Sequence, residues 1–232
     1  MIPIRDRNPS STFPIVNVIL IIINVVVFLY EFSLGPELEV FINRYGLVPA
    51  YLFYSQDSGF FDRVYPFFTS MFLHGGWLHL IGNMLYLYIF GDNVEDRIGH
   101  LRYLLFYLIT GFAAAFTQII INVNSTVPMV GASGAISGVL GAYLLFFPKS
   151  KILTLVPIFF FLHLVEIPAA ILLVLWFVMQ FFSGVASVAM TQSSGGVAFW
   201  AHIGGFVAGL ILARVFQKKG YYRTGWSGRY YG

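Results

Sequence analysis

Among the few polar side chains inside the long apolar segments of the sequence are a serine and two histidines. Ser133 opens a segment rich in small residues, His79 lies near the start of an earlier segment, and His202 near the start of the last. A serine hydroxyl is a poor nucleophile until a base takes its proton, and a neutral histidine within hydrogen-bond reach is the usual base. Ser133 and His202 are therefore candidates for a nucleophile and its general base.

The same segments carry groups that could bind an oxyanion, the negative charge that develops during acyl transfer. Asn83 follows His79 by four residues, so both side chains fall on one face of a helix. A helix that begins at Ser133 would offer unpaired backbone N–H groups and a partial positive charge at its N-terminus. We therefore expect the Ser133 backbone N–H, His79 and Asn83 to act as oxyanion donors.

The composition of the chain indicates an integral membrane protein. Of its 232 residues, 58% are hydrophobic and only 10% are charged, whereas soluble domains contain about 25% charged residues. The sequence has no cysteine, which excludes disulfides and thiolate metal sites. No basic run interleaved with aromatic residues occurs before the short C-terminal tail, so we expect no nucleic-acid partner.

Six apolar segments are long enough to cross a membrane, which predicts an all-α fold. Residues 34–76, between the first two segments, mix prolines, charges and aromatics and should form short amphipathic helices at the membrane interface. Pro157 and Pro168 predict a break before the fifth segment, and the charged residues at 92–102 predict a solvated turn after the second. The predicted spans cover about residues 13–30, 77–90, 103–123, 131–147, 166–182 and 198–216.

The distribution of positive charge predicts the orientation of these spans. Six spans place both termini on one side, and that side carries 11 of the 13 Lys and Arg residues; only Arg44 and Arg63 fall on the other. The positive-inside rule then puts both termini in the cytoplasm of a cell-membrane protein. The chain would have a cytoplasmic tail at 1–11, a membrane domain at 12–216, and a basic, aromatic tail at 217–232 that lies on the anionic membrane surface.

This topology places all the candidate site residues at a similar depth, near the outer ends of their helices. In the fourth span Ser133 shares a face with Gly141, and in the sixth His202 shares a face with Gly205 and Gly209. These glycines allow the two helices to touch and to bring His202 to Ser133. Because no Asp or Glu lies near the outer ends of the second, third, fourth or sixth spans, we expect a Ser–His dyad and no triad.

Three motifs occur in order on the second, fourth and sixth spans. They are His79-Leu80-Ile81-Gly82-Asn83, Gly131-Ala132-Ser133-Gly134, and Ala201-His202-Ile203-Gly204-Gly205 with Gly209. In this combination the sequence resembles the rhomboid family of intramembrane serine proteases, from the first span to the sixth. The resemblance implies a rhomboid-like bundle of six transmembrane helices, with a half-embedded outer loop between helices 1 and 2.

The resemblance also implies roles for the candidate residues. Ser133 would be the nucleophile and His202 the base, and His79 and Asn83 would help to form the oxyanion hole. The substrates would be single-pass membrane proteins, cut within their transmembrane segments near the outer ends, with a small residue favoured before the cut. The fifth helix and the loop at 183–197 would form the substrate gate and its cap.

Two positions depart from the pattern of other family members. Many members carry Trp-Arg in the outer loop, where this sequence reads Tyr65-Pro66 with Arg63 nearby. Some carry a tyrosine one turn after the nucleophile, stacked on the catalytic histidine, where this sequence has Ser137. Neither change removes a group that performs chemistry, but a different aromatic residue, or none, must then hold His202.

Other functions remain as alternatives. The Ser133 segment could be a packing motif in a catalytically silent member of the fold that binds membrane clients. A transporter would require repeated halves with broken helices, which the sequence lacks. The histidines at 74, 79 and 202 have no cysteine, carboxylate or HExxH motif to help them bind a metal, so we expect no metal and no cofactor. We interpret His74 as a structural hydrogen bonder and expect substrates and membrane lipids as partners.

Overall fold

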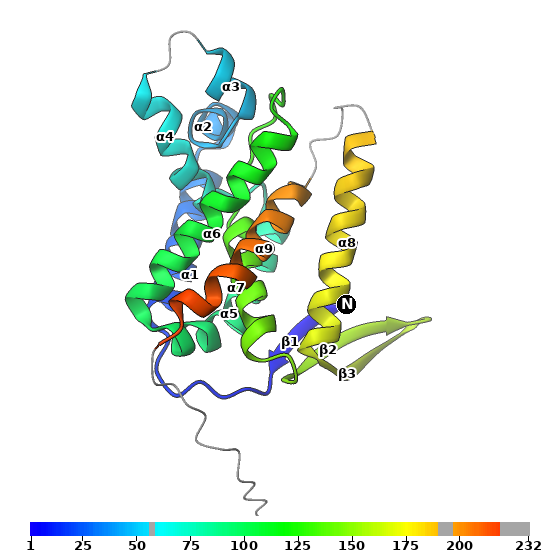
Figure 1. Ribbon diagram of the computed structural model, residues 1–232. Helices are drawn as coiled ribbons and strands as arrows, with labels where there is room; N and C mark the ends of the chain where they lie inside the picture. Colours follow the sequence, from blue (N-terminus) through cyan, green and yellow to red (C-terminus); the bar gives the residue numbers. More distant parts are fainter. Residues whose placement is uncertain (56–58, 190–196, 219–232) are drawn as a thin grey trace, which may run out of the picture.

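The structure is a computed structural model that describes residues 1–55, 59–189 and 197–218 (Figure 1). Helices dominate it, and each of the six predicted spans overlaps one helix of a bundle. The helices that coincide with the predicted spans are α1 (Ile15–Ser33), α5 (Trp77–Ile98), α6 (His100–Ile121), α7 (Ser133–Phe146), α8 (Ala169–Ala189) and α9 (Phe199–Phe216).

Four of the described helices are long and apolar enough to cross a membrane, namely α1, α6, α8 and α9. Helix α7 is apolar but has only 14 residues, and α5 carries several charged residues in its last turns. Four such helices indicate a multi-pass membrane protein. The count of six spans and the cytoplasmic placement of the termini stay predictions.

The segment between α1 and α5 consists of short helices, as its sequence predicts. It contains the single turns η1 (Gly35–Glu37) and η2 (Ser70–Phe72) and the helices α2 (Leu38–Tyr45), α3 (Pro49–Tyr54) and α4 (Phe60–Thr69). In Figure 1 these helices gather beside one end of α1 and α6. Whether this segment is half-embedded in the membrane stays a prediction.

A three-stranded antiparallel sheet shows that the all-α prediction is wrong at the other end of the bundle. Strand β2 (Lys151–Ile158) pairs with β3 (Phe161–Pro168) as a hairpin, and β1 (Ile2–Asp6) pairs with the other edge of β2. Ile152 and Thr154 are fully buried while Lys151 is exposed, which is the alternation of a strand. An apolar run alone does not distinguish a strand from a helix, which is why the sequence pattern predicted no strand here.

Helix α8 differs from the predicted fifth span at both ends. It begins at Ala169, directly after Pro168, because the hairpin occupies the residues before it. It continues to Ala189, so the first part of the segment predicted as a loop at 183–197 is helical. Residues 190–196 of that predicted cap, and all of the predicted C-terminal tail beyond Lys218, lie outside the described residues.

Most of the charged residues predicted to form a solvated turn after the second span are instead part of α5, where Glu95 and Asp96 are buried; His100 and Arg102 lie exposed at the start of α6. The Glu95 carboxylate is fully buried and accepts the backbone N–H groups of Val16 (3.0 Å) and Asn17 (2.7 Å), at the start of α1. Asp96 accepts hydrogen bonds from the hydroxyls of Ser11 and Thr12. The first turn of a helix has N–H groups without partners, and the Glu95 carboxylate caps that end of α1, while Asp96 holds the segment that leads into it.

Helices α7 and α9 pack backbone to backbone, which is the contact that positions the candidate site. A β-carbon added at Gly205 would overlap the carbonyl oxygen of Gly134, and one added at Gly209 would overlap that of Gly138. On the α7 side, a β-carbon at Gly141 would overlap the carbonyl oxygen of Phe206. Only glycine permits this approach, as in the packing of small residues between membrane helices.

We predict that Gly209→Ala lowers the free energy of unfolding by about 1–3 kcal/mol, because the new methyl group must push α9 away from α7. The matched control is Gly82→Ala in α5, where a β-carbon meets no atom within 4 Å. This control should leave stability unchanged or raise it by up to about 1 kcal/mol. Thermal unfolding of both variants in the same detergent compares them, and equal stabilities would contradict the packing argument.

Candidate active site

The structure brings Ser133 and His202 into hydrogen-bond contact, as the sequence predicts. Ser133 is the first residue of α7, and His202 lies in the first turn of α9. The Ser133 hydroxyl lies 2.8 Å from Nε2 of His202. His202 is buried and Ser133 is half-buried. When Nε2 is unprotonated, the serine hydroxyl donates to it, which is the arrangement of a nucleophile with its base.

Two side chains of α8 hold the His202 ring in place, and sequence reasoning missed both. The Nδ1 atom of His202 lies 2.7 Å from Oε1 of Gln180, so its N–H donates to that amide oxygen. The Trp176 ring lies against the imidazole, with 5.9 Å between centroids and 35° between planes. A hydrogen bond at Nδ1 fixes the tautomer in which Nε2 is free to accept a proton. Trp176 thus supplies the aromatic contact that the sequence left unassigned.

The spacing of these two residues is the signal that could have found them. Trp176 and Gln180 are four residues apart, so they share a face of α8. Gln180 is a polar side chain in a helix that is otherwise almost wholly apolar, and such a group is expected to face the protein interior. The group beside Nδ1 of His202 is thus the neutral amide of Gln180, and not the carboxylate that would complete a triad.

His79 lies beside the loop that leads to Ser133. Its Nδ1 atom accepts the backbone N–H of Gly75 at 3.4 Å, which leaves Nε2 as the atom that carries the proton. The ring packs against Gly131, where an added β-carbon would lie 2.7 Å from Cε1 and from Nε2. Gly131 has φ of +123°, a backbone angle that residues with a side chain rarely adopt. Its N–H donates to the Ser70 carbonyl at 2.8 Å. Glycine is thus needed at position 131 both for the backbone and for the ring.

Asn83 lies one turn further along α5, on the same side as His79. Its side chain is buried, and its Nδ2 has no hydrogen-bond partner in the described part of the chain. Leaving a buried donor unpaired costs about 1–3 kcal/mol, so such groups commonly serve a ligand or a reacting species. No described contact joins Asn83 to Ser133, and the oxyanion roles of His79 and Asn83 stay predictions.

A buried glutamate of α1 supports the backbone beside His79. The Glu31 carboxylate is almost fully buried and accepts the N–H of His74 with both oxygens, at 3.1 and 3.3 Å. The His74 ring meets the edge of the His79 ring at a centroid distance of 5.1 Å. Burial lowers the pKa of His74 to about 4, so this ring is neutral at physiological pH. Sequence reasoning missed Glu31, which lies at the end of the first apolar segment.

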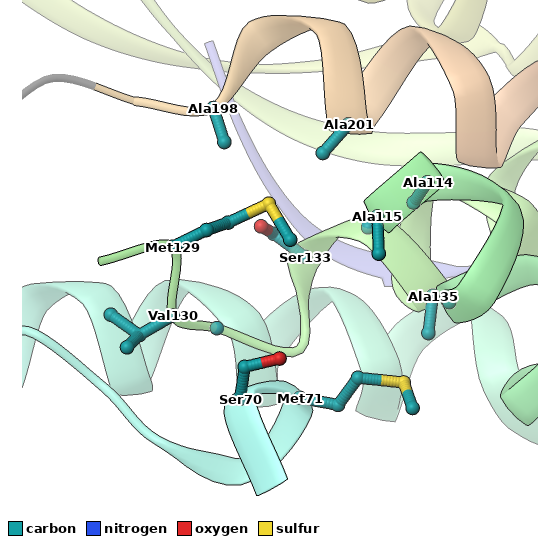
Figure 2. A pocket seen from close by; sticks show the side chains of 13 residues that line it. Ser70, Met71, Ala114, Ala115, Met129, Val130, Ser133, Ala135, Ala198 and Ala201 are labelled. Carbon is teal, nitrogen blue, oxygen red and sulfur yellow. The ribbon is translucent and has the colours of Figure 1, made fainter. Parts of the chain in front are cut away.

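A small cavity opens beside the Ser133 hydroxyl (Figure 2). Its volume is about 20 Å³, which is enough for one water molecule. Figure 2 shows the side chain of Met129 beside Ser133, with Ala198 and Ala201 of the α9 end on one side and Ser70 on the other. The side chains around the serine are therefore small or flexible.

The two positions that depart from the family pattern have other local roles. The Ser137 hydroxyl donates to the carbonyl of Ser133 at 2.6 Å, one turn back in the same helix. In the outer segment, Tyr65 donates to the carbonyl of Arg44, and the Arg63 guanidinium donates to the carbonyl of Ser55. These bonds tie the short helices together without contacting His202.

The family of the chain can be assigned from sequence comparison. A family model described as the Rhomboid domain matches residues 62–219, which is more than half of the chain and includes all four candidate site residues. The chain belongs to the rhomboid family. Some of its relatives are named as proteases and others as inactive proteins.

Three relatives illustrate that range. RHOMBOID-like protein 1 of Arabidopsis thaliana is 33% identical over 160 residues, which cover 69% of this chain and 36% of the relative. Rhomboid protease AarA of Providencia stuartii is 29% identical over 210 residues, which cover 84% of this chain and 69% of the relative. Inactive rhomboid protein 1 of Drosophila melanogaster is 31% identical over 112 residues, which cover 48% of this chain and 7% of the relative. The chain thus spans well under half the length of the first and most of the bacterial protease.

We predict that Gln180→Leu slows the reaction of Ser133 with a fluorophosphonate on the order of 10-fold, because one hydrogen bond worth about 0.5–1.5 kcal/mol no longer orients His202. Gln180→Glu keeps an acceptor at this position and should retain most of the reactivity. Met179→Leu is the matched control, since Met179 is exposed on another face of α8. Equal labelling rates for Gln180→Leu and Met179→Leu would show that Gln180 does not orient the ring.

Proposed function

We propose that this rhomboid-family protein is a serine endopeptidase that cleaves transmembrane segments of single-pass membrane proteins near their outer ends. The observation that carries the proposal is the 2.8 Å contact between the Ser133 hydroxyl and Nε2 of His202. The bond from Nδ1 of His202 to Gln180 supports it, because it leaves Nε2 as the atom that accepts a proton.

In the proposed reaction, the Ser133 oxygen attacks the carbonyl carbon of the scissile peptide while Nε2 of His202 takes the hydroxyl proton. The resulting tetrahedral intermediate collapses, the C–N bond breaks, and the imidazolium gives its proton to the leaving amine. A water molecule then attacks the acyl-enzyme ester with His202 again as base, which releases the new carboxyl end and restores the Ser133 hydroxyl.

The oxyanion of the intermediate would be stabilised by neutral donors. The backbone N–H of Ser133 lies at the start of α7, where helical N–H groups have no partner within the helix. The Nε2–H of His79 packs beside Gly131, and the Nδ2 of Asn83 is buried without a partner in the described residues. Donors fixed before the reaction cost little reorganisation as charge develops, which makes them effective catalysts.

The surroundings of Ser133 favour a small substrate residue next to the cut. The cavity beside the hydroxyl has a volume of about 20 Å³, and the described lining residues include Ala198, Ala201 and Gly131. A methyl group fits such a space, whereas a large aromatic side chain would need the lining residues to move. The location of the cut near the outer membrane surface rests on the predicted topology.

The similarity to Inactive rhomboid protein 1 of Drosophila melanogaster favours one alternative, a silent protein that binds membrane clients. Such a protein would keep the bundle but lack the reaction. Both Ser133 and His202 are present in this chain and within hydrogen-bond distance. The similarity to Rhomboid protease AarA, which extends over more of this chain, favours the enzyme.

We predict that Ser133→Ala and His202→Ala each reduce cleavage of a reporter transmembrane segment to background, because one removes the nucleophile and the other its base. The reporter should be reconstituted with the purified protein in liposomes, and the products identified by mass spectrometry. Ser137→Ala is the matched serine control, since its hydroxyl bonds only its own helix, and it should cleave at nearly the wild-type rate.

Three outcomes of this experiment are distinguishable. Wild-type cleavage by Ser133→Ala would overturn the assignment of the nucleophile. A folded wild-type protein that neither cleaves any reporter nor reacts with a fluorophosphonate would support the silent alternative. Reaction of Ser133 with the fluorophosphonate that disappears in His202→Ala would support the dyad independently of the choice of reporter.

We predict that Asn83→Ala lowers kcat on the order of 10–10³-fold with little change in KM, since it removes one oxyanion donor of several. Asn43→Ala in α2 is the matched control, because the Asn43 amide bonds the Glu39 carbonyl far from the site along the chain. Steady-state cleavage of the reporter separates kcat from KM. A rise in KM alone would assign Asn83 to substrate binding.

A further inference from the structure

The tip of the hairpin formed by β2 and β3 is built from aromatic residues that nothing in the described chain covers. Ile158 and Phe161 form its last strand pair, so Phe159 and Phe160 make a two-residue turn. Phe159 is 94% exposed and Phe160 is 98% exposed. Both phenyl rings therefore extend almost entirely into the surroundings of the protein.

The backbone of this turn makes the choice of residues unusual. Phe159 has φ of +53°, and it is the one non-glycine residue of the described chain with positive φ. Two-residue hairpin turns favour Asn and Gly because these residues tolerate positive φ, and a bulky residue there is strained. In water this turn carries two costs, the strain of the Phe159 backbone and the exposure of two phenyl rings. An apolar environment would remove the second cost, the exposure of apolar rings to water.

The polarity of the hairpin changes along its length. Next to the tip, Phe161, Leu162 and Leu164 are each more than 60% exposed. At the base, Glu166 of β3 forms ion pairs with Lys151 of β2 and with Arg7. At a membrane interface, the apolar end of the hairpin would contact the acyl chains and the charged end would contact the headgroups and water.

The position of the hairpin in the fold also fits a membrane interface. It is joined directly to α8, which begins at Ala169 and is a candidate span. In Figure 1 the hairpin leaves the bundle beside the first turns of α8 and extends sideways, across the direction of that helix. The first part of α8 exposes Ile171 and Val174, so the apolar surface of the hairpin adjoins an apolar surface that would face lipid.

Exposed positive charge accompanies this apolar surface. Lys149 directly precedes β2, and Arg5 lies in the neighbouring strand β1; both side chains are exposed. Lysine and arginine near an interface attract the anionic headgroups of the leaflet they face, by about 1 kcal/mol each. The aromatic tip fits the acyl chains of lipids, and the flanking cations fit anionic headgroups. A lipid bilayer is the one partner that offers both.

We propose that the β2–β3 hairpin is a membrane anchor, whose tip from Phe159 to Leu162 inserts into the leaflet that contains the start of α8. The anchor lies on the same chain as the candidate active site but does not depend on its chemistry. It would hold the start of the helix that carries Trp176 and Gln180 at a fixed depth in the bilayer.

The natural absence of cysteine allows a direct test with single labels. Phe160→Cys and the control Lys149→Cys would each carry a nitroxide, in full-length protein reconstituted in liposomes of phosphatidylcholine and phosphatidylglycerol. Electron paramagnetic resonance then compares collisions with oxygen, which dissolves in lipid, and with a nickel chelate, which stays in water. We expect oxygen to dominate at 160 and nickel at 149; equal access of nickel to both labels would overturn the proposal.

A second variant separates the aromatic tip from the fold of the hairpin. Phe159→Asn combined with Phe160→Gly provides a favourable two-residue turn, so the strands should still pair. A nitroxide at Leu162→Cys should collide mainly with oxygen when the tip is native and become accessible to nickel when it is Asn-Gly. No change on this substitution would overturn the proposal, and spectral broadening between labels would overturn it in favour of contact with a second copy.

Discussion

The contact between Ser133 and His202 depends on two helix backbones that approach more closely than any side chain would allow. Gly205 and Gly209 of α9 pack directly on the carbonyl oxygens of Gly134 and Gly138 in α7. Because both helices are stiff, this contact fixes the position of one first turn relative to the other, and the serine and the histidine lie in these turns. Glycine costs helix stability of about 0.5–1 kcal/mol per residue in a soluble helix, and close packing between membrane helices offsets that cost.

Buried carboxylates hold the bundle at both ends by binding backbone N–H groups. Glu95 caps the start of α1, and Glu31 near the end of α1 binds the N–H of His74 beside the site. A buried charge without partners would be strongly destabilising, and the two backbone N–H bonds that Glu95 accepts compensate its burial. Helix α1 thus connects to α5 at one end and to the segment that precedes α5 at the other. The side of the site that carries the proposed oxyanion donors is therefore supported by a helix that contributes no proposed reacting group.

The sequence was sufficient to predict contacts that follow from helical spacing and was insufficient for contacts that depend on distant partners. The depth of the polar residues and the glycine spacing in α7 and α9 predicted that His202 meets Ser133. The spacing of Trp176 and Gln180 marks an inward face of α8, but no pattern in the sequence shows which residue of another helix Gln180 meets. The burial of Glu95 depends on residues almost 80 positions earlier. The hairpin was missed because its strands are long apolar runs whose prolines suggested a broken helix.

The choice of an amide beside His202 has a consequence for where charge is stabilised in the proposed reaction. A carboxylate at the position of Gln180 would stabilise the imidazolium but would bury a permanent charge between helices, at a large desolvation cost. Gln180 orients the ring and stays neutral, so it offers the imidazolium only a dipole. The ion pair formed by imidazolium and oxyanion must then be stabilised mainly from the oxyanion side. The start of α7, the Nε2–H of His79 and the unpaired amide of Asn83 are neutral donors suited to that task, because they carry no charge that must be desolvated before the reaction.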